Sequence, residues 1–180
     1  MFKKIKELNL NYCEKRRFNN TINYIKKTLQ LHGKILDLGI ENKLSERMQK
    51  EGSLVKNTNG KDLDLYPINH ESKNFDAVTA FEILEHLLCP FNILKEIKCN
   101  KLYATVPLNL WYSKAFRDIE DERARHFHEF KDWQFDWLLE KSGWNVVRKE
   151  KWINPSFVPG IRPILRNFTN RYYAIEAIKK

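Results

Sequence analysis

Short apolar runs that alternate with helical segments constrain this chain more than any other feature of its sequence. The runs at 34–39, 75–81 and 102–106 have the length and composition of buried strands, and turn residues or proline follow them. Between the runs, at 44–48 and 91–97, apolar residues recur at the three- and four-residue spacing of helices. Strands that alternate with helices predict βαβ units and a mainly parallel α/β sheet.

The sequence predicts further elements along the chain. They are a helix that begins at Asn20 or Thr21 and ends at Gly33, a weak strand at 53–56, a helical segment at 82–88, a helix capped by Asp132, and strands at 144–147 and 172–178. A long connection at 108–130 carries Trp111, Tyr112 and Phe116. These aromatic side chains either cover a substrate or fill the core.

The length and composition fit a single globular domain. The chain has 180 residues, of which 42% are hydrophobic and 31% charged. Three widely spaced cysteines predict a reducing compartment instead of a disulfide framework or a zinc site. The charged N-terminus lacks the pattern of a secretory signal, and no apolar stretch is long enough to span a membrane. We therefore expect a cytoplasmic protein.

The chain is basic, with a formal net charge of +9. Such a charge fits nucleic acid, an anionic membrane surface or an acidic substrate as partner. The lysines are spread along the whole chain, which equally fits a solvated surface. No nucleic-acid-binding motif is present, so a nucleic acid partner is possible but has no motif to support it.

The first run ends in a turn with a possible ligand-binding residue. Asp37 closes the run and Gly39 follows two positions later. Ligands of parallel α/β sheets bind at the carboxyl ends of the strands, and a glycine there lets the backbone approach a ligand closely. A strand followed by D-x-G is also common as an ordinary turn, so this segment alone leaves both interpretations open.

Four further segments, in order along the chain, resemble a known family. They read D-L-D-L-Y-P at 62–67, F-D-x-V-x-x-x-E-x-L-E-H-L at 75–87, T-V-P at 105–107, and H-E-F at 128–130 followed by a helix with two leucines. Together with the Asp37 turn, these segments resemble the class I S-adenosylmethionine-dependent methyltransferases. The resemblance implies a single Rossmann-like domain with a mainly parallel seven-stranded-type sheet and an antiparallel last strand. This chain departs from the family in having a shortened region between strands 1 and 4.

The resemblance also implies that three segments of the chain have different roles. Residues 1–33 form an N-terminal helical segment, 34–107 the cofactor-binding half and 108–180 the substrate-side half. The cofactor is S-adenosylmethionine. The predicted cofactor-binding residues are Asp37, Gly39, Glu41, Asp62, Leu63, Asp64, Ala80, Phe81 and Glu82.

Within that set, different residues meet different parts of the cofactor. Asp37 and Gly39 match the turn that cradles the methionine end, and Asp62 with Leu63 matches the segment that meets the adenine. Residues 80–82 match the strand end that lines the sulfonium. Asp64 is a candidate for the ribose contact.

Glu41 is the main departure from the family pattern, because it stands where the cofactor turn of that family has its second glycine. A side chain there crowds the backbone approach, unless Glu41 itself binds the cofactor.

Three histidines are candidates for a general base, which methyl transfer needs only if the acceptor must lose a proton. They are His86, His126 and His128, and each has an equally simple structural role in helix packing or loop hydrogen bonding. His126 and His128 form an H-x-H pair, but no third ligand stands at a recognisable spacing, so we expect no metal site.

The sequence leaves alternatives open. The acceptor is a small molecule or a glycan- or lipid-type intermediate, and RNA stays possible. A non-catalytic relative that binds a partner is the main alternative, with Glu41 as its best support. A nicotinamide-dependent oxidoreductase would need G-x-G-x-x-G after the first strand, and a hydrolase of the nucleophile-elbow type would need G-x-S-x-G; neither motif occurs. Arg162, Arg166 and Arg171 lie at the surface or bind an anionic group of the substrate.

Overall fold

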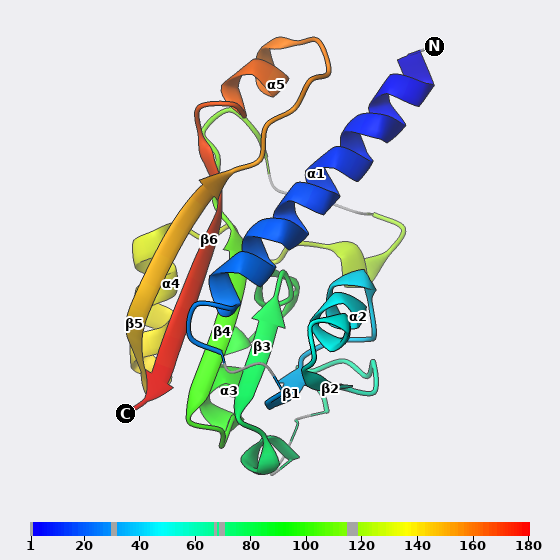
Figure 1. Ribbon diagram of the computed structural model, residues 1–180. Coiled ribbons are helices and arrows are strands. Elements are labelled where there is room, and N and C mark those ends of the chain that lie inside the picture. Colours follow the sequence, from blue (N-terminus) through cyan, green and yellow to red (C-terminus); the bar gives the residue numbers. More distant parts are fainter. Residues whose placement is uncertain (1, 30–31, 67, 69–70, 115–118) are drawn as a thin grey trace.

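The computed structural model describes residues 2–29, 32–66, 68, 71–114 and 119–180. Its centre is one six-stranded sheet in the order β2-β1-β3-β4-β6-β5, with helices on both faces (Figure 1). The strands are β1 (Lys34–Asp37), β2 (Leu54–Asn57), β3 (Ala77–Phe81), β4 (Lys101–Pro107), β5 (Trp144–Ile153) and β6 (Asn170–Lys179). The α-helices are α1 (Phe2–Ile25), α2 (Lys43–Lys50), α3 (Pro90–Glu96), α4 (Asp132–Lys141) and α5 (Ile161–Leu165). Short 3-10 helices are η1 (Glu71–Asn74), η2 (Leu84–His86) and η3 (Glu122–Ala124).

The strand directions confirm the predicted fold class. Strands β2, β1, β3 and β4 run parallel, and the last strand, β6, is antiparallel to both β4 and β5. The described residues hold six strands instead of seven, because those between β2 and β3 form turns and η1 and no strand. The shortened region predicted at this point therefore accounts for the missing strand.

Two hydrophobic cores fill the spaces between sheet and helices. On one face α3 and α4 pack against the sheet, and the fully buried Trp144 donates a hydrogen bond from Nε1 to the carbonyl of Leu94, 2.9 Å away. On the other face lie the C-terminal half of α1 and α2, with Tyr24 and Met48 buried there. Figure 1 shows α1 and α2 in front of the sheet, with α3 and α4 behind it. No described helix combines the length and apolar character needed to cross a bilayer.

The helix that we expected to start at Asn20 or Thr21 begins at Phe2 instead. The N-terminal half of this helix has no apolar periodicity in the sequence, because the residues that it buries are polar or small. Asn9 and Cys13 face the segment that follows β5, and Asn9 Oδ1 accepts hydrogen bonds from Ser156 Oγ and Phe157 N. Leu8 and Leu10 are exposed, so the apolar residues of this half lie on its solvent face and not on its buried face.

Other boundaries also differ from expectation. The segment at 82–88, which we expected to be helical, contains only the 3-10 turn η2. Asp132 begins α4 but does not cap it; Lys131 precedes the helix, and its N–H donates to Gln134 Oε1 at 3.2 Å. The last two strands are each ten residues long, because β5 and β6 pair with one another well beyond the expected apolar runs.

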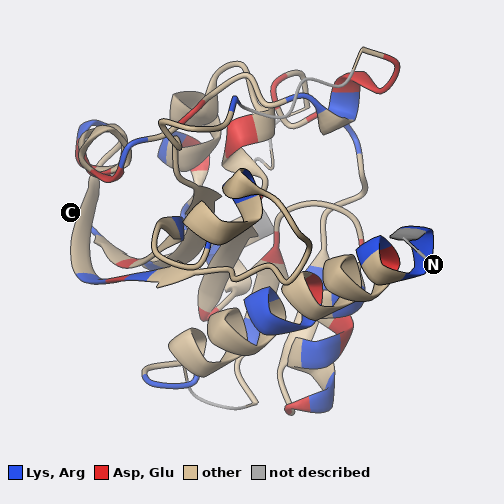
Figure 2. Cartoon of the chain, turned by 90° about the horizontal axis from the view of Figure 1, so that it is seen from above, with Lys and Arg blue, Asp and Glu red and all other residues tan. Residues whose placement is uncertain are grey.

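Basic residues are distributed over many elements, as the sequence indicates. Figure 2 shows lysine and arginine along α1 and on several other helices and loops, interspersed with acidic residues.

Candidate active site

A cavity of about 620 Å³ lies at the carboxyl edge of the parallel strands. The ends of β1, β3 and β4 form its floor, α1 and the start of α2 form one wall, and the start of β6 and the loop after β4 form another. Its lining residues are Glu14, Arg17, Phe18, Thr21, Asp37, Leu38, Asn42, Lys43, Leu44, Phe81, Glu82, Glu85, His86, Thr105, Pro107, His126, Arg171 and Tyr172. This is the position at which parallel α/β sheets bind their ligands.

Asp37 occupies the last position of β1 and is buried at the floor of the cavity. Its carboxylate accepts hydrogen bonds from Thr79 Oγ1 at 2.6 Å and Asn57 Nδ2 at 3.0 Å. Burial raises the pKa of Asp37 to about 6, although these two hydrogen bonds act in the opposite direction. The side chain is thus held in a fixed position by Thr79 in the middle of β3 and Asn57 at the end of β2.

The turn after β1 needs glycine only at position 39. Gly39 has a φ of +107°, and a Cβ at this position would lie 3.1 Å from Ile83 Cδ1, so only glycine fits without a shift. Its N–H donates to Thr58 Oγ1 at 2.8 Å. Glu41 is exposed, does not line the cavity and has no left-handed backbone. Asn42 then caps α2 by accepting from the N–H groups of its first turn.

Glu82 is the residue at which the chain leaves β3. Its φ of +54° lies in the left-handed region, which is uncommon for a residue with a side chain and often marks functional sites. The carboxylate approaches Arg17 Nη1 of α1 to 3.5 Å, and its Oε1 has no hydrogen-bond partner among the described residues. Burial raises the pKa of Glu82, and the neighbouring Arg17 opposes this shift.

A second group of polar side chains lies next to Glu82 on the same floor. The Glu85 side chain is buried, and its Oε1 lies 3.8 Å from His86 Nε2. The rings of His86 and His126 meet edge to face, 4.7 Å apart. Burial lowers the pKa of both histidines, that of His126 to about 4, so both imidazoles are neutral at pH 7.

The cavity brings together five of the predicted site residues from four separate segments. These are Asp37, Phe81, Glu82, His86 and His126. Gly39 and Ala80 lie in the adjoining backbone but do not line it, and Ala80 is fully buried.

The predicted adenine and ribose contacts do not line this cavity. Leu63 is buried in the larger hydrophobic core, and Asp62 Oδ1 accepts the N–H of Asp64 at 2.9 Å. The Asp64 carboxylate in turn accepts the N–H groups of Leu88 and Cys89 at 2.7 and 2.8 Å, just before α3. The roles of Asp62, Leu63 and Asp64 in binding an adenosine group stay predictions. The Asp64 carboxylate is already hydrogen-bonded to the backbone just before α3.

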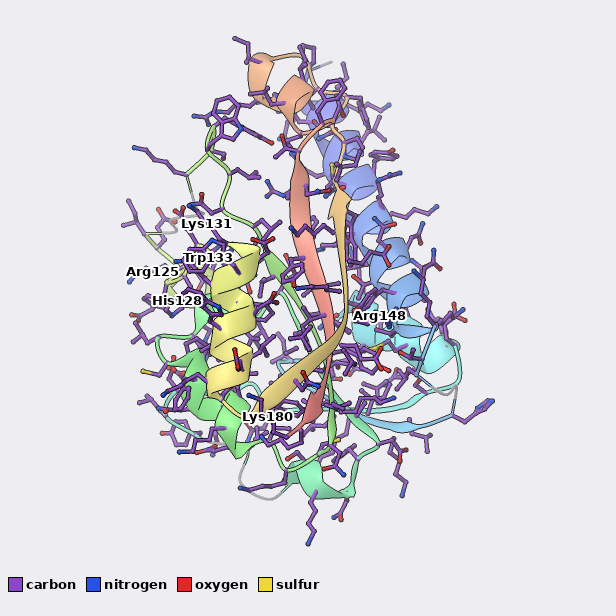
Figure 3. All side chains as sticks on the ribbon, turned by 90° about the vertical axis from the view of Figure 1, so that its left-hand side faces the viewer. Arg125, His128, Lys131, Trp133, Arg148 and Lys180 are labelled. Atoms are coloured by element: carbon purple, nitrogen blue, oxygen red, sulfur yellow. The ribbon has the colours of Figure 1, made fainter. Side chains whose placement is uncertain are left out.

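His128 belongs to a neighbouring cavity of about 280 Å³, which His126 also borders. Its Nε2 donates to the carbonyl of Leu88 at 3.2 Å, and Figure 3 shows it beside the N-terminal end of α4. In the same connection, Trp111 is largely exposed with its ring edge-on to Tyr112, whereas Phe116 lies outside the described residues.

Several lining residues could not be found from the sequence. Glu14 and Arg17 come from the part of α1 that has no apolar periodicity, and Tyr172 comes from the start of a strand near the other end of the chain. Glu85 is part of the E-x-L-E-H segment. From the sequence it has the pattern of an exposed residue on a helix, whereas in the structure it is buried.

Comparisons with known proteins place this geometry in context. No protein-family model matches the chain, and no curated protein does. Among solved structures, 1,6-didemethyltoxoflavin-N1-methyltransferase from Burkholderia thailandensis, with 1,6-didemethyltoxoflavin and S-adenosylhomocysteine bound, has a TM-score of 0.65 at 14% identity, over 91% of this chain and 78% of that chain. A putative S-adenosylmethionine-dependent methyltransferase from Listeria monocytogenes has a TM-score of 0.63 at 13% identity, over 91% of this chain and 98% of that chain.

The chain has the class I methyltransferase fold. A further similar structure shows what this fold leaves open: the [4+2]-cyclase SpnF has a TM-score of 0.58 at 13% identity, over 90% of this chain and 80% of that chain. Because one fold serves more than one reaction, the function of this methyltransferase-fold chain has to be argued from its own cavity.

Proposed function

We propose that the chain is an S-adenosylmethionine-dependent methyltransferase that acts on a small acceptor in the cavity described above. The observation that carries this proposal is the pair of carboxylates at the strand ends. Asp37 closes β1 and Glu82 follows β3, and both face one cavity at the carboxyl edge of the sheet. A cationic ligand with further polar groups fits such a floor.

The charges around the cavity fit the cofactor. S-adenosylmethionine supplies, when bound, a methyl group on a positively charged sulfur. It also carries an ammonium and a carboxylate, so its site needs groups of both signs. We propose that Asp37 and Glu82 hold its cationic part, and that Lys43 and Arg171, which also line the cavity, hold its carboxylate.

The chain's own contribution to methyl transfer is alignment. An in-line displacement gains most of its rate from holding the reacting groups in position, and rigid strand ends do this better than loops. Asp37 is fixed by two hydrogen bonds, and the N–H of Glu82 donates to the carbonyl of Thr105 at 3.0 Å. Phe81 and Pro107 supply apolar walls at the same strand ends, which limit the access of water.

The size of the cavity favours a small acceptor. Its volume lies within the range of about 300–1,000 Å³ typical of small-molecule sites, which leaves room for one end of the cofactor and a compact acceptor. A glycan- or lipid-type acceptor would extend into the neighbouring cavity of about 280 Å³, which shares Pro107, His126 and Arg171 with the first.

Calorimetric titration with S-adenosylhomocysteine and S-adenosylmethionine tests the proposal directly. We expect binding by the wild type and a loss of affinity of at least about tenfold in Glu82→Gln, since a charge-assisted contact contributes about 1.5–3 kcal/mol. Glu140→Gln, a change on the exposed surface of α4, is the matched control and should bind as the wild type does. The absence of binding at millimolar ligand in a folded wild-type sample would contradict the proposal.

Turnover distinguishes an enzyme from a non-catalytic binding protein of the same fold. Incubation with S-adenosylmethionine labelled in its methyl group, together with pools of small hydroxyl- and amine-bearing acceptors, should yield labelled product. Binding of the cofactor without product from any pool would favour the non-catalytic alternative.

A further inference from the structure

We propose that Glu85, His86 and His126 bind a divalent transition-metal ion at the floor of the cavity. One ligand atom from each side chain lies within 4.8 Å of the others. The H-x-H spacing in the sequence points to His126 and His128 as a pair, but the fold joins His126 to Glu85 and His86 instead. The expectation that no metal site exists rested on the spacing of histidines and cysteines along the sequence.

Glu85 provides the anionic ligand. Its side chain is only 1% exposed, and its Oε2 has no hydrogen-bond partner among the described residues. A buried carboxylate oxygen without a partner is costly, and a bound cation removes that cost. Among the described residues, Glu85 forms no ion pair with a lysine or arginine, and Arg17 pairs with Glu82.

The tautomer of His86 suits a metal ligand. Its Nδ1 lies 2.9 Å from the carbonyl oxygen of Arg125, which can only accept, so Nδ1 carries the proton. Nε2 therefore presents a lone pair, and it faces Glu85 Oε1 at 3.8 Å. Two acceptors that face each other are stabilised by a proton or a metal cation between them. A backbone carbonyl on the other ring nitrogen is the usual outer partner of a metal-bound histidine.

The third ligand is positioned by the backbone around it. The N–H groups of Phe127 and His128 donate to the carbonyl of Glu85 at 2.8 and 3.2 Å. These bonds fix the loop after β4 directly over η2, and they hold the His126 ring edge-on to that of His86. The three ligands thus come from two segments that backbone hydrogen bonds hold in register.

The donor set indicates the class of ion. Two imidazoles and one carboxylate suit zinc, cobalt, manganese or iron, whereas magnesium prefers oxygen ligands. Ligand atoms about 2.1 Å from a tetrahedral ion lie roughly 3.4 Å apart, so small side-chain rotations close the observed group around an ion. In this arrangement the lone pairs of His86 and His126 point at the metal, which makes them ligands and not general bases.

The ion would keep open coordination positions, because the protein supplies only three ligands. These positions face the cavity that all three residues line. A role in catalysis rests on the proposed function: an acceptor hydroxyl bound there would lose its proton to solvent more easily. Its oxygen would then form the bond to the methyl carbon, while the sulfonium sulfur keeps the electron pair of the broken bond.

The test is a titration of the metal-free full chain with Co²⁺, followed by visible absorption. We expect one equivalent to bind and to give the bands of a low-coordinate cobalt site, and Zn²⁺ but not Mg²⁺ to displace it. Glu85→Gln and His126→Ala should each weaken binding by more than about 100-fold, beyond the loss typical of an outer-shell change. His128→Ala, two residues away in the same loop, should retain the wild-type affinity.

The outcomes separate this proposal from the proposed function. A wild type that binds S-adenosylhomocysteine but not Co²⁺ would overturn the metal site alone. Cobalt bands unchanged in His126→Ala would also overturn it, and this loop variant stays informative if the buried Glu85→Gln change impairs folding. A chain that binds Co²⁺ with the expected variant pattern but no S-adenosylhomocysteine would uphold the metal site and contradict the methyltransferase proposal.

Discussion

At the scale of single residues, the site depends on two strand-end carboxylates that the fold holds in unfavourable positions. Asp37 is buried with two neutral hydrogen-bond partners, and Glu82 has a left-handed backbone. Both arrangements carry a cost in stability for the folded chain, and both place a carboxyl group in the lining of the cavity. Such local costs are typical of functional sites.

The raised pKa of Asp37 should make the stability of the folded chain depend on pH. Its pKa of about 6 in the folded chain lies above the ordinary 3.8, so the folded state binds this proton more tightly than the unfolded state. The resulting stabilisation is complete below pH 3.8 and is lost as the pH rises through 6. Relative to Asp37→Asn, we expect the free energy of unfolding of the wild type to fall by up to about 3 kcal/mol between pH 4 and pH 7.5. Urea denaturation of both proteins measures this, and a pH-independent difference would contradict it.

Glu41 should be dispensable for cofactor binding. Its side chain is exposed and outside the cavity, and its backbone is not left-handed. We therefore expect Glu41→Gly to change the affinity for S-adenosylhomocysteine by less than about twofold, with at most about 1 kcal/mol lost in stability through added backbone freedom. A tenfold gain in affinity, measured by calorimetry, would show that the side chain enters the site after all.

At the scale of elements, α1 supplies one wall of the cavity, so its attachment to the sheet matters for function. Arg148 of β5, labelled in Figure 3, contributes to that attachment. It donates to the carbonyl of Tyr24 at 2.9 Å and to Thr28 Oγ1, just after α1, at 3.0 Å. Its Nε also pairs with the buried carboxylate of Glu176 at 2.8 Å. Its guanidinium lies 3.8 Å from the centre of the Tyr24 ring.

Removing this arginine should loosen α1. We expect Arg148→Met to lower the free energy of unfolding by about 2–4 kcal/mol, because Glu176 stays buried with its main cation lost. Arg148→Lys should recover only part of this, since lysine cannot make the same set of bonds. Chemical denaturation measures both variants, with Arg123→Met at an exposed position of the 3-10 helix η3 as the control. Equal stability of wild type and Arg148→Met would show that α1 is held by its apolar contacts alone.

At the scale of the whole molecule, the cavity wall joins α1 to β6, two elements from opposite ends of the sequence. A ligand there should stabilise the folded state as a unit. With S-adenosylhomocysteine at 100 times its Kd, we expect a gain of about 2.7 kcal/mol and a rise in Tm of roughly 5–10 °C. Hydrogen exchange should slow in residues 14–21 and 171–172 as well as at the strand ends. Protection confined to the strand ends would show that α1 takes no part in binding.

The sequence by itself determined the alternation of strands and helices, and with it the parallel sheet and the edge at which sheets of this kind bind their ligands. Apolar runs and turn residues carry this information locally, so β1, β3 and β4 could be placed and Asp37 and Glu82 recognised at their ends. The start of α1 could not be found, because its buried face consists of Asn9 and Cys13 and is defined only by the segment that packs on it.

Only the tertiary structure decided which side chains meet. Arg17 reaches Glu82 across 65 positions of sequence, and His126 joins Glu85 and His86 because backbone hydrogen bonds hold a distant loop over η2. The same applies to Glu41, which the sequence places in the cofactor turn and the fold turns toward solvent. Periodicity reports which face of an element is buried, whereas the contacts of a site depend on how separate elements pack, and no local pattern encodes that.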